Sequence, residues 1–262
     1  MYEKTKYTAH PTDEKGKVAY TAEENAIWQE LFQRQQKIVQ NRACQAYLEG
    51  LSLLQLPSDR IPQCDEVSER LRQISNWCVV PVPALISADE FFTLLSQRKF
   101  PAASFIRLRE EIDYLEEPDI FHEIFGHCPL LTEPVYADFM QEYGKFALQA
   151  SEEDRHFLAR LYWFTVEFGL IHTEEGLRIY GGGILSSKNE TIYALEAPHA
   201  KRLPFSGLAA LRTPYRIDIM QPVYFVIEDF QTLYNLLEHD IAGLIEQARQ
   251  LGEYPPLFPG NN

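Results

Sequence analysis

The sequence has few cysteines, no long apolar run and few basic residues, and each of these absences argues against one class of protein. Its four cysteines show no CxxC spacing, and a chain of 262 residues needs no disulfides, so we expect buried free thiols. There is no run of eighteen apolar residues and no apolar N-terminal stretch, which argues against a membrane span or a signal peptide. Basic residues are also few. The formal net charge is −14, which disfavours nucleic acid and anionic membranes as partners.

These absences and the composition predict a cytoplasmic globular protein, a monomer or small homo-oligomer. Hydrophobic residues make up 45% of the chain and charged residues 24%, as in ordinary soluble domains. We expect one domain over residues 1–262, in which residues 1–20 form an extended polar arm. The pattern beyond this arm predicts a mainly α fold with a few short β-strands, an α+β class.

Capping signals and apolar spacing predict the helices. The capping box at 21–24 predicts a long helix that stops at Gly50, and Asp65 is expected to cap a helix that ends near Asn76. A second capping box at 87–90 opens a helix that Pro101 should end. Further helices are expected at residues 119–125, 136–148, 152–171 and 228–251, the last stopped by Gly252, and short strands at 77–82, 178–185 and 191–195.

The segment EPDIFHEIFGHCP places His122 and His127 among carboxylates and apolar residues, a combination that favours a metal site. The spacing is HExxxH rather than the HExxH of zinc proteases. On an ideal α-helix, residues five positions apart point about 140° away from each other. The two histidines can therefore bind one ion only if the helix has a bulge or ends near Gly126.

A third ligand is suggested by Glu167. The stretch FLARLYWFTVEFGLI is apolar except for Arg160 and Glu167, so its helix should be buried. A buried carboxylate is costly unless a cation neutralises it. Two histidines and one carboxylate form the facial triad of non-haem Fe(II) oxygenases. The alternatives are core histidines bonded to backbone carbonyls and a Glu167–Arg160 ion pair. His156 and His172 are expected at the surface.

Four longer motifs, in this order, resemble the pterin-dependent aromatic amino acid hydroxylases: EPDIFHEIFGHCPLL, LARLYWFTVEFGL, IYGGGILSS and TPYRIDIMQPVYF. The resemblance spans residues 22–251 and implies the catalytic domain alone, without the regulatory domain or tetramerisation helix of animal relatives. It implies that a mononuclear Fe(II) is held by His122, His127 and Glu167. It further implies two sets of ligand contacts. The substrate contacts are Arg107, Pro118, Trp163, Phe168, Gly183 and Ser186, and the pterin contacts are Ala84, Leu85, Ile86, Phe91 and Glu123.

The activity implied by the resemblance is hydroxylation of L-phenylalanine to L-tyrosine by O2 and tetrahydrobiopterin or a related reduced pterin, in phenylalanine catabolism. Ile217 favours phenylalanine, because the family's tyrosine enzymes carry a polar residue at that position. Pro101 stands where animal relatives have a histidine near the pterin. Alternatives are a tyrosine or tryptophan hydroxylase, a zinc hydrolase with Glu123 as its base, and a metal-free binding protein of the same fold.

Overall fold

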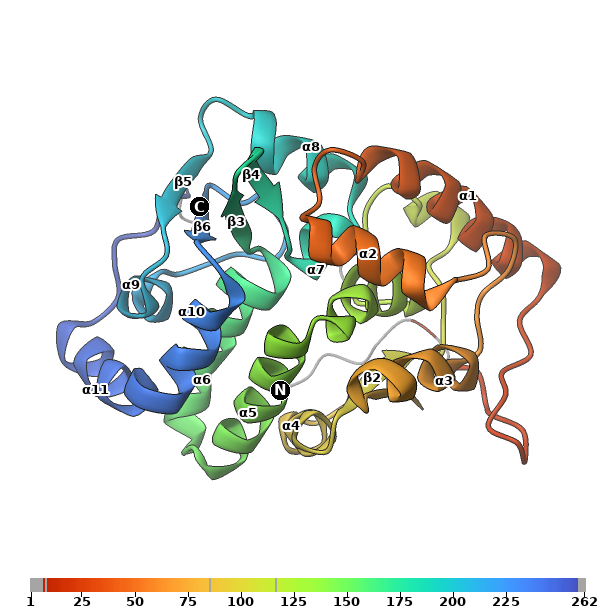
Figure 1. Cartoon of the computed structure of the whole chain (residues 1–262), viewed down its shortest axis with the longest axis horizontal. Coiled ribbons are helices and arrows are strands. Elements are labelled where there is room, and N and C mark those ends of the chain that lie inside the picture. The colour runs from red at the N-terminus through yellow and green to blue at the C-terminus, as the bar shows by residue number, and fades with distance from the viewer. Residues whose placement is uncertain (1–6, 8, 85, 116, 259–262) are drawn as a thin grey trace.

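The computed structural model describes residue 7 and residues 9–84, 86–115 and 117–258, and most of these residues are helical (Figure 1). The α-helices are α1 (Ala22–Ile38), α2 (Gln45–Leu54), α3 (Cys64–Ser75), α4 (Ala88–Ser96), α5 (Pro134–Gln149), α6 (Glu152–Tyr162), α7 (Gly182–Leu185), α8 (Lys188–Glu196), α9 (Gly207–Arg212), α10 (Phe230–Asn235) and α11 (Ile241–Leu251). Short 3-10 helices are η1 (Arg109–Glu111) and η3 (Cys128–Thr132). Three π-helical turns are η2 (His122–His127), η4 (Trp163–Glu167) and η5 (Leu236–Asp240).

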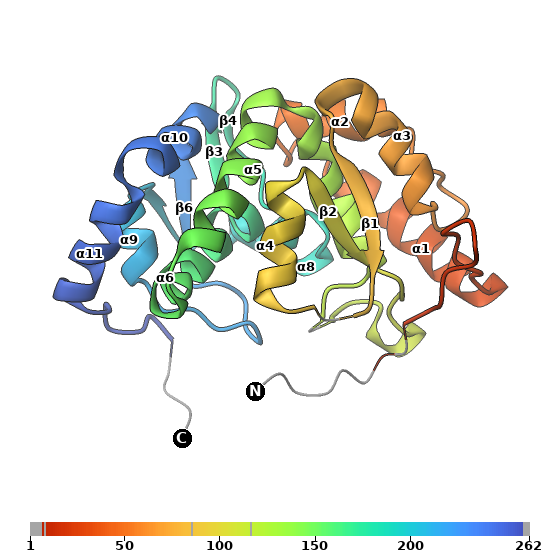
Figure 2. The same ribbon diagram turned by 90° about the horizontal axis from the view of Figure 1, so that it is seen from below.

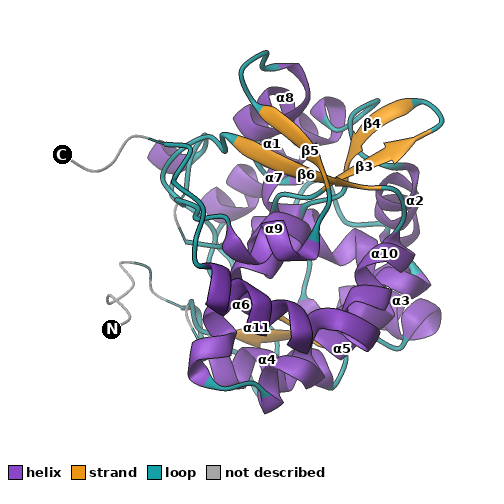
Figure 3. Cartoon of the chain, turned by 90° about the vertical axis from the view of Figure 1, so that its left-hand side faces the viewer, coloured by secondary structure: helices purple, strands orange, loops and turns teal. Residues whose placement is uncertain are grey.

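Short strands form two small sheets. Strands β1 (Cys78–Val82) and β2 (Lys99–Ala103) pair in parallel and lie between α3 and α4 (Figure 2). Strands β3 (Leu170–Thr173), β4 (Gly176–Ile179), β5 (Lys201–Pro204) and β6 (Val223–Ile227) form a sheet in the order β4-β3-β6-β5, with only β3 and β4 antiparallel. Figure 3 shows this sheet at one end of the molecule, beside the helices. The expected α+β class is confirmed.

The segment that carries the two histidines is embedded in an aromatic core. The rings of Phe121 and Phe125 stack with centroids 4.9 Å apart, and Trp28 of α1 meets Phe121 edge-on at 5.4 Å. The Tyr47 hydroxyl donates to the Phe125 carbonyl at 2.7 Å. All four side chains are fully buried, so this part of the backbone is fixed by packing from two other helices.

The long helix expected from residue 21 to residue 50 is two helices. It breaks after Ile38, where Asn41 has a φ of +60° and the Cys44 N–H bonds the Ile179 carbonyl at 2.8 Å. Gly50 does not end the second helix. A Cβ there would lie 2.0 Å from the Pro129 carbonyl oxygen, so glycine permits α2 to pack closely against η3.

Two cap assignments also require correction. Gln63, rather than Asp65, is the N-cap of α3 and forms a capping box with Glu66, whereas the expected end at Asn76 is confirmed. Helix α4 begins after Ser87 as expected but ends at Ser96. Pro101 lies inside β2 opposite Val80, where it ends no helix.

Further differences concern strands and helices in the second half. The helix expected at 152–171 ends at Glu167, because Leu170 and Ile171 join β3. Residues 191–195 are helical rather than extended, since Ser187 caps α8 by accepting from the Glu190 N–H. Residues 182–185 form α7, so only the first part of the strand expected at 178–185 exists. The last helix begins at Phe230, includes the π-turn η5, and stops at Gly252 as expected.

The described part of the N-terminal arm is not fully extended, because Thr12 and Val18 form an antiparallel bridge. The cysteines are unpaired, and Cys44, Cys64 and Cys128 are buried, in agreement with the expectation of free thiols. Among the described residues, no helix combines the length and the apolar character that a membrane crossing requires.

Candidate metal and substrate site

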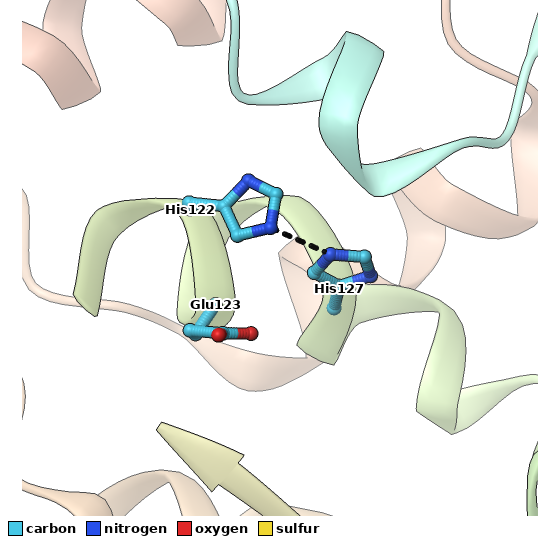
Figure 4. Close-up of side chains that lie close together, drawn as sticks. All are labelled: His122, Glu123 and His127. Atoms are coloured by element: carbon cyan, nitrogen blue, oxygen red, sulfur yellow. Dashed lines mark hydrogen bonds between the residues drawn. The ribbon is translucent and has the colours of Figure 1, made fainter. Parts of the chain in front are cut away.

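The two histidines of the HExxxH motif face each other because their segment is a π-helix. In η2 the backbone bonds run from residue i to residue i+5, so residues five apart lie on the same side. The Nε2 atoms of His122 and His127 are 3.0 Å apart (Figure 4). The bulge that the motif spacing requires near Gly126 is therefore present.

Glu167 approaches both histidines from a second π-turn. Its carboxylate oxygens lie 3.4 Å from His127 Nε2 and 3.7 Å from His122 Nε2. Arg160 does not neutralise Glu167, since it bonds Glu253 and the Leu211 carbonyl instead. Two ligand atoms that each lie about 2.1 Å from one ion at right angles are about 3.0 Å apart. The three residues thus fit one metal ion with little movement.

A second carboxylate, Glu123, also lies near the histidines, since its oxygen and the two imidazole nitrogens are all within 4.8 Å of one another. The pKa values of the two carboxylates are shifted in opposite directions. Burial and the nearby Glu167 and Asp119 raise the pKa of Glu123 well above its usual value. Burial would also raise the pKa of Glu167, but His127, His122 and a backbone hydrogen bond from Gly183 hold that pKa below its usual value. The lowered pKa favours the ionised, metal-binding form of Glu167, and the raised pKa favours the protonated form of Glu123.

Ser186 orients one of the histidines. The Ser186 hydroxyl donates to the Gly182 carbonyl at 2.9 Å and lies 2.9 Å from His122 Nδ1. The hydroxyl proton points to the Gly182 carbonyl, so the proton between Ser186 and His122 is carried by His122 Nδ1. His122 Nε2 is then unprotonated and can bind a metal. Burial lowers the pKa of His122 to about 4, which also favours the neutral, metal-binding form.

The triple glycine gives the candidate metal ligands His127 and Glu167 room. A Cβ on Gly182 would lie 2.4 Å from His127 Nδ1, and a Cβ on Gly183 would lie 2.7 Å from a Glu167 carboxylate oxygen. The chain of α7 can therefore pass beside both ligands only without side chains at these positions. No phosphate-binding role is needed to explain the motif.

A cavity of about 470 Å³ opens beside His122 and Glu167. The six residues expected to contact the substrate all line it: Arg107, Pro118, Trp163, Phe168, Gly183 and Ser186. Arg107 is buried, and its Nε and one Nη donate to the two oxygens of Asp119 at 2.8 and 3.0 Å. The guanidinium is thus held in one orientation at the cavity wall, where a carboxylate could pair with it.

The described residues among those expected to contact the pterin are not part of this cavity lining. Ala84 is buried against Ala103 and Phe105, and Phe91 packs against the Tyr162 ring at 5.6 Å, while Ile86 is half-buried. Leu85 lies outside the described residues. Glu123 is brought next to the histidines, as described above. The pterin contacts therefore stay a prediction.

Sequence reasoning missed Asp119 as a functional residue. Besides fixing Arg107, its Oδ1 accepts the backbone N–H of His122 at 2.9 Å, so one carboxylate connects the cavity arginine to the histidine segment. Its position three residues before His122 is that of an N-cap, and this signal could have identified it. His156 and His172 are exposed, as expected.

Comparisons with known proteins agree with this geometry. Residues 3–250 match the family described as biopterin-dependent aromatic amino acid hydroxylase. The phenylalanine-4-hydroxylase of Vibrio cholerae is 53% identical over 97% of this chain and 88% of its own length. A structure of phenylalanine hydroxylase from Legionella pneumophila is 54% identical, with a TM-score of 0.94 over 96% of this chain and 100% of that chain.

A structure of phenylalanine hydroxylase from Chromobacterium violaceum contains iron(III) and the oxidised cofactor 7,8-dihydrobiopterin. It is 45% identical, with a TM-score of 0.86 over 90% of this chain and 85% of that chain. The family match covers nearly the whole chain, and the Vibrio and Legionella enzymes are each more than half identical to it. This chain therefore belongs to the biopterin-dependent aromatic amino acid hydroxylase family.

Proposed function

We propose that this chain is a phenylalanine 4-hydroxylase, which converts L-phenylalanine to L-tyrosine with O2 and a reduced pterin. The observation that carries the proposal is the convergence of His122, His127 and Glu167 at one end of a cavity lined by aromatic side chains and an arginine. Three ligands in this arrangement would hold an ion and leave one of its sides open to reactants, as a facial triad requires. When bound, Fe(II) and the reduced pterin together supply the O2 activation that the aromatic ring needs.

The protein's own residues position the substrate in this proposal. Arg107, oriented by Asp119, binds the carboxylate of the amino acid through charge-assisted hydrogen bonds. Trp163 and Phe168 pack with ring centroids 4.4 Å apart and give an apolar wall for the substrate ring. The substrate ring is thus held between the arginine and the metal ligands. This fixed position lowers the entropic cost of bringing the reacting groups together.

Preference for phenylalanine over tyrosine follows from Ile217, which lines the cavity together with Ile219 and Met220. These apolar side chains offer no partner for a substrate hydroxyl. Because a hydrophobic pocket rejects an added hydroxyl only weakly, the preference should be modest, roughly 10²-fold or less.

A zinc hydrolase is the rival from another class, and it would use Glu123 as a general base. The two histidines have HExxxH spacing on the π-helix η2, which differs from the α-helical HExxH of zinc proteases. This difference disfavours the hydrolase.

The proposal also places the protein in the cytoplasm, as a monomer or small homo-oligomer that acts on small molecules in phenylalanine catabolism. The net charge of −14 supports the absence of nucleic acid and anionic membrane partners. Light scattering of the purified protein measures the oligomeric state.

The decisive experiment is reconstitution without oxygen. The metal-free protein is loaded with Fe(II) and mixed with L-phenylalanine and tetrahydrobiopterin, O2 is admitted, and tyrosine is quantified. Tyrosine should form only when iron, pterin and O2 are all present. Folded, iron-loaded protein that forms no tyrosine, or zinc-loaded protein that cleaves peptides, would contradict the proposal.

A further inference from the structure

Trp163 forms part of the cavity wall and is restrained on several sides. Its ring stacks on Tyr215 with centroids 4.4 Å apart and an interplanar angle of 16°, and it packs against Phe168. The indole also makes a directional contact, the hydrogen bond from its Nε1 to Gln221 Oε1 at 3.1 Å, which favours one side-chain conformation of Trp163.

The same glutamine organises a different part of the cavity. Gln221 precedes β6, and its side-chain Nε2 donates to the Arg216 carbonyl at 2.9 Å and to the Ile219 carbonyl at 3.0 Å. These two bonds close the loop that brings Ile217, Ile219 and Met220 to the cavity. Only 1% of Gln221 is exposed, so water cannot replace the partners of its amide.

Gln221 is anchored in turn by a buried carboxyl group of α8. Its backbone N–H donates to Glu190 Oε1 at 3.1 Å, and the Tyr224 hydroxyl of β6 donates to the same oxygen. Glu190 is itself buried and lines the cavity. One amide side chain thus connects the aromatic wall on η4 to the loop before β6, while its backbone is fixed to α8.

We propose that Gln221 is a positioning residue that determines which aromatic ring the cavity accepts, because it holds the Trp163 indole and the 216–220 loop in a fixed relation. The inference rests on the proposed function, in that the cavity is taken to bind the substrate ring. Gln221 does not line the cavity. It acts through Trp163 and through the loop.

The test compares Gln221→Met with a matched control, Gln141→Met. Gln141 also accepts a hydrogen bond through its amide oxygen, from Arg98 Nε at 2.9 Å, and donates through its amide nitrogen, to the Ser96 carbonyl at 3.0 Å, but it lies on α5 outside the cavity lining. Both variants lose a half-buried or buried amide. A purely structural role would therefore affect stability in both and substrate choice in neither.

The measurements are kcat and KM for L-phenylalanine and for L-tryptophan, whose ring is larger, with Fe(II)-loaded enzyme at saturating tetrahydrobiopterin. In Gln221→Met, KM for phenylalanine should rise by about two- to tenfold, the value of one hydrogen bond, and the preference for phenylalanine over tryptophan should narrow. Gln141→Met should leave KM for phenylalanine and the preference for phenylalanine over tryptophan unchanged. If KM for phenylalanine and the preference for phenylalanine over tryptophan are the same in the two variants, the inference is overturned. The proposed function would remain intact.

Trp163→Phe extends the test if Gln221→Met does not fold. This substitution removes the indole N–H but leaves the loop sequence unchanged, so hydrogen exchange of backbone amides at 213–222 should speed up in the variant if the wall and the loop are coupled. Unchanged exchange would overturn the coupling.

A thermodynamic cycle of the two substitutions gives a final check. Gln221→Met should have a smaller effect on phenylalanine affinity, measured by calorimetry, in the Trp163→Phe background than in the natural protein. If the effects of the two substitutions on phenylalanine affinity simply add, the inference is contradicted. If the natural protein binds phenylalanine but forms no tyrosine, the proposed reaction fails while this cycle can still be measured.

Discussion

The Nε2 atoms of His122 and His127 lie 3.0 Å apart, although five positions separate the two residues in the chain. The π-turn η2 makes this approach possible, and it needs a close backbone contact at Gly126. A Cβ on Gly126 would lie 2.6 Å from the Gly182 carbonyl oxygen and 3.2 Å from Ser186 Cβ. The histidines of η2 and the segment after β4 therefore depend on each other's position.

Gly126→Ala should disturb this contact. We expect the free energy of unfolding to fall by about 1–3 kcal/mol, the usual cost of overpacking, and Fe(II) affinity to fall as the histidines separate. Metal titration and thermal unfolding measure the two effects. Gly243→Ala on α11 is the matched control, because a Cβ there meets nothing within 4 Å. It should leave iron affinity unchanged and stabilise the helix by up to about 1 kcal/mol. If both variants bind iron normally, the close contact at Gly126 does not matter for the site.

Substitution of the two carboxylates near the histidines should have different effects. Glu167→Gln replaces the ionised ligand by a neutral amide, so Fe(II) affinity should fall by at least about 100-fold and tyrosine formation should be lost. Burial and the neighbouring carboxylates Glu167 and Asp119 raise the pKa of Glu123, so Glu123→Gln should change iron affinity much less than Glu167→Gln does. Anaerobic Fe(II) titration of both variants compares them directly. Stronger iron loss in Glu123→Gln would assign the third ligand to Glu123.

The need for a helix irregularity could be predicted from the HExxxH spacing, and η2 meets it. Glu167 could be predicted because a lone carboxylate in an apolar stretch requires a cation. The family was predicted from four motifs, and the comparisons confirm it. The predictions of the irregular helix and of the family succeed because each motif is read from residues close together in the chain, while the role of Glu167 as a metal ligand stays a prediction.

Other features could not be read from the sequence because they depend on distant contacts. Residues 191–195 are rich in β-branched and aromatic side chains, which favour strands, but the Ser187 cap and packing against α1 make them helical. Gly50 seemed to be a helix stop, yet it marks the approach of Pro129, 79 positions away. Gln221 meets Trp163 across 58 positions. No local pattern identifies such partners.

Ser186 should act on the metal site through His122. Ser186→Ala removes the oxygen that lies 2.9 Å from His122 Nδ1, so the imidazole loses its fixed orientation, and Fe(II) affinity should fall by about 10- to 100-fold. The neighbouring substitution Ser187→Ala is the control. It removes the cap of α8 and should lower the free energy of unfolding by about 0.5–2 kcal/mol with iron affinity unchanged. Equal loss of iron in the two variants would mean that Ser186 acts only through local folding.

Asp119 should make stability depend on pH in the acid range. Burial would raise the pKa of Asp119, but the charge and hydrogen bonds of Arg107 and the His122 N–H hold that pKa below its usual value. A carboxyl whose pKa is lowered by folding stabilises the native state at every pH above its unfolded pKa, about 3.9, and this contribution is lost as the pH falls through the lower, folded pKa.

Asp119→Asn should therefore reduce the free energy of unfolding by about 3–5 kcal/mol at pH 7, because Arg107 is left buried without its counter-charge. The difference from the natural protein should shrink below pH 4, where Asp119 begins to bind a proton in the unfolded chain. Denaturant unfolding of the metal-free proteins at several pH values measures it. Asp65→Asn is the control, because the Asp65–Lys17 pair, at 3.2 Å, is exposed and should contribute about 0–1 kcal/mol. A pH-independent difference in Asp119→Asn would show that the loss of stability comes from hydrogen bonds that the amide cannot reproduce and not from the carboxylate charge.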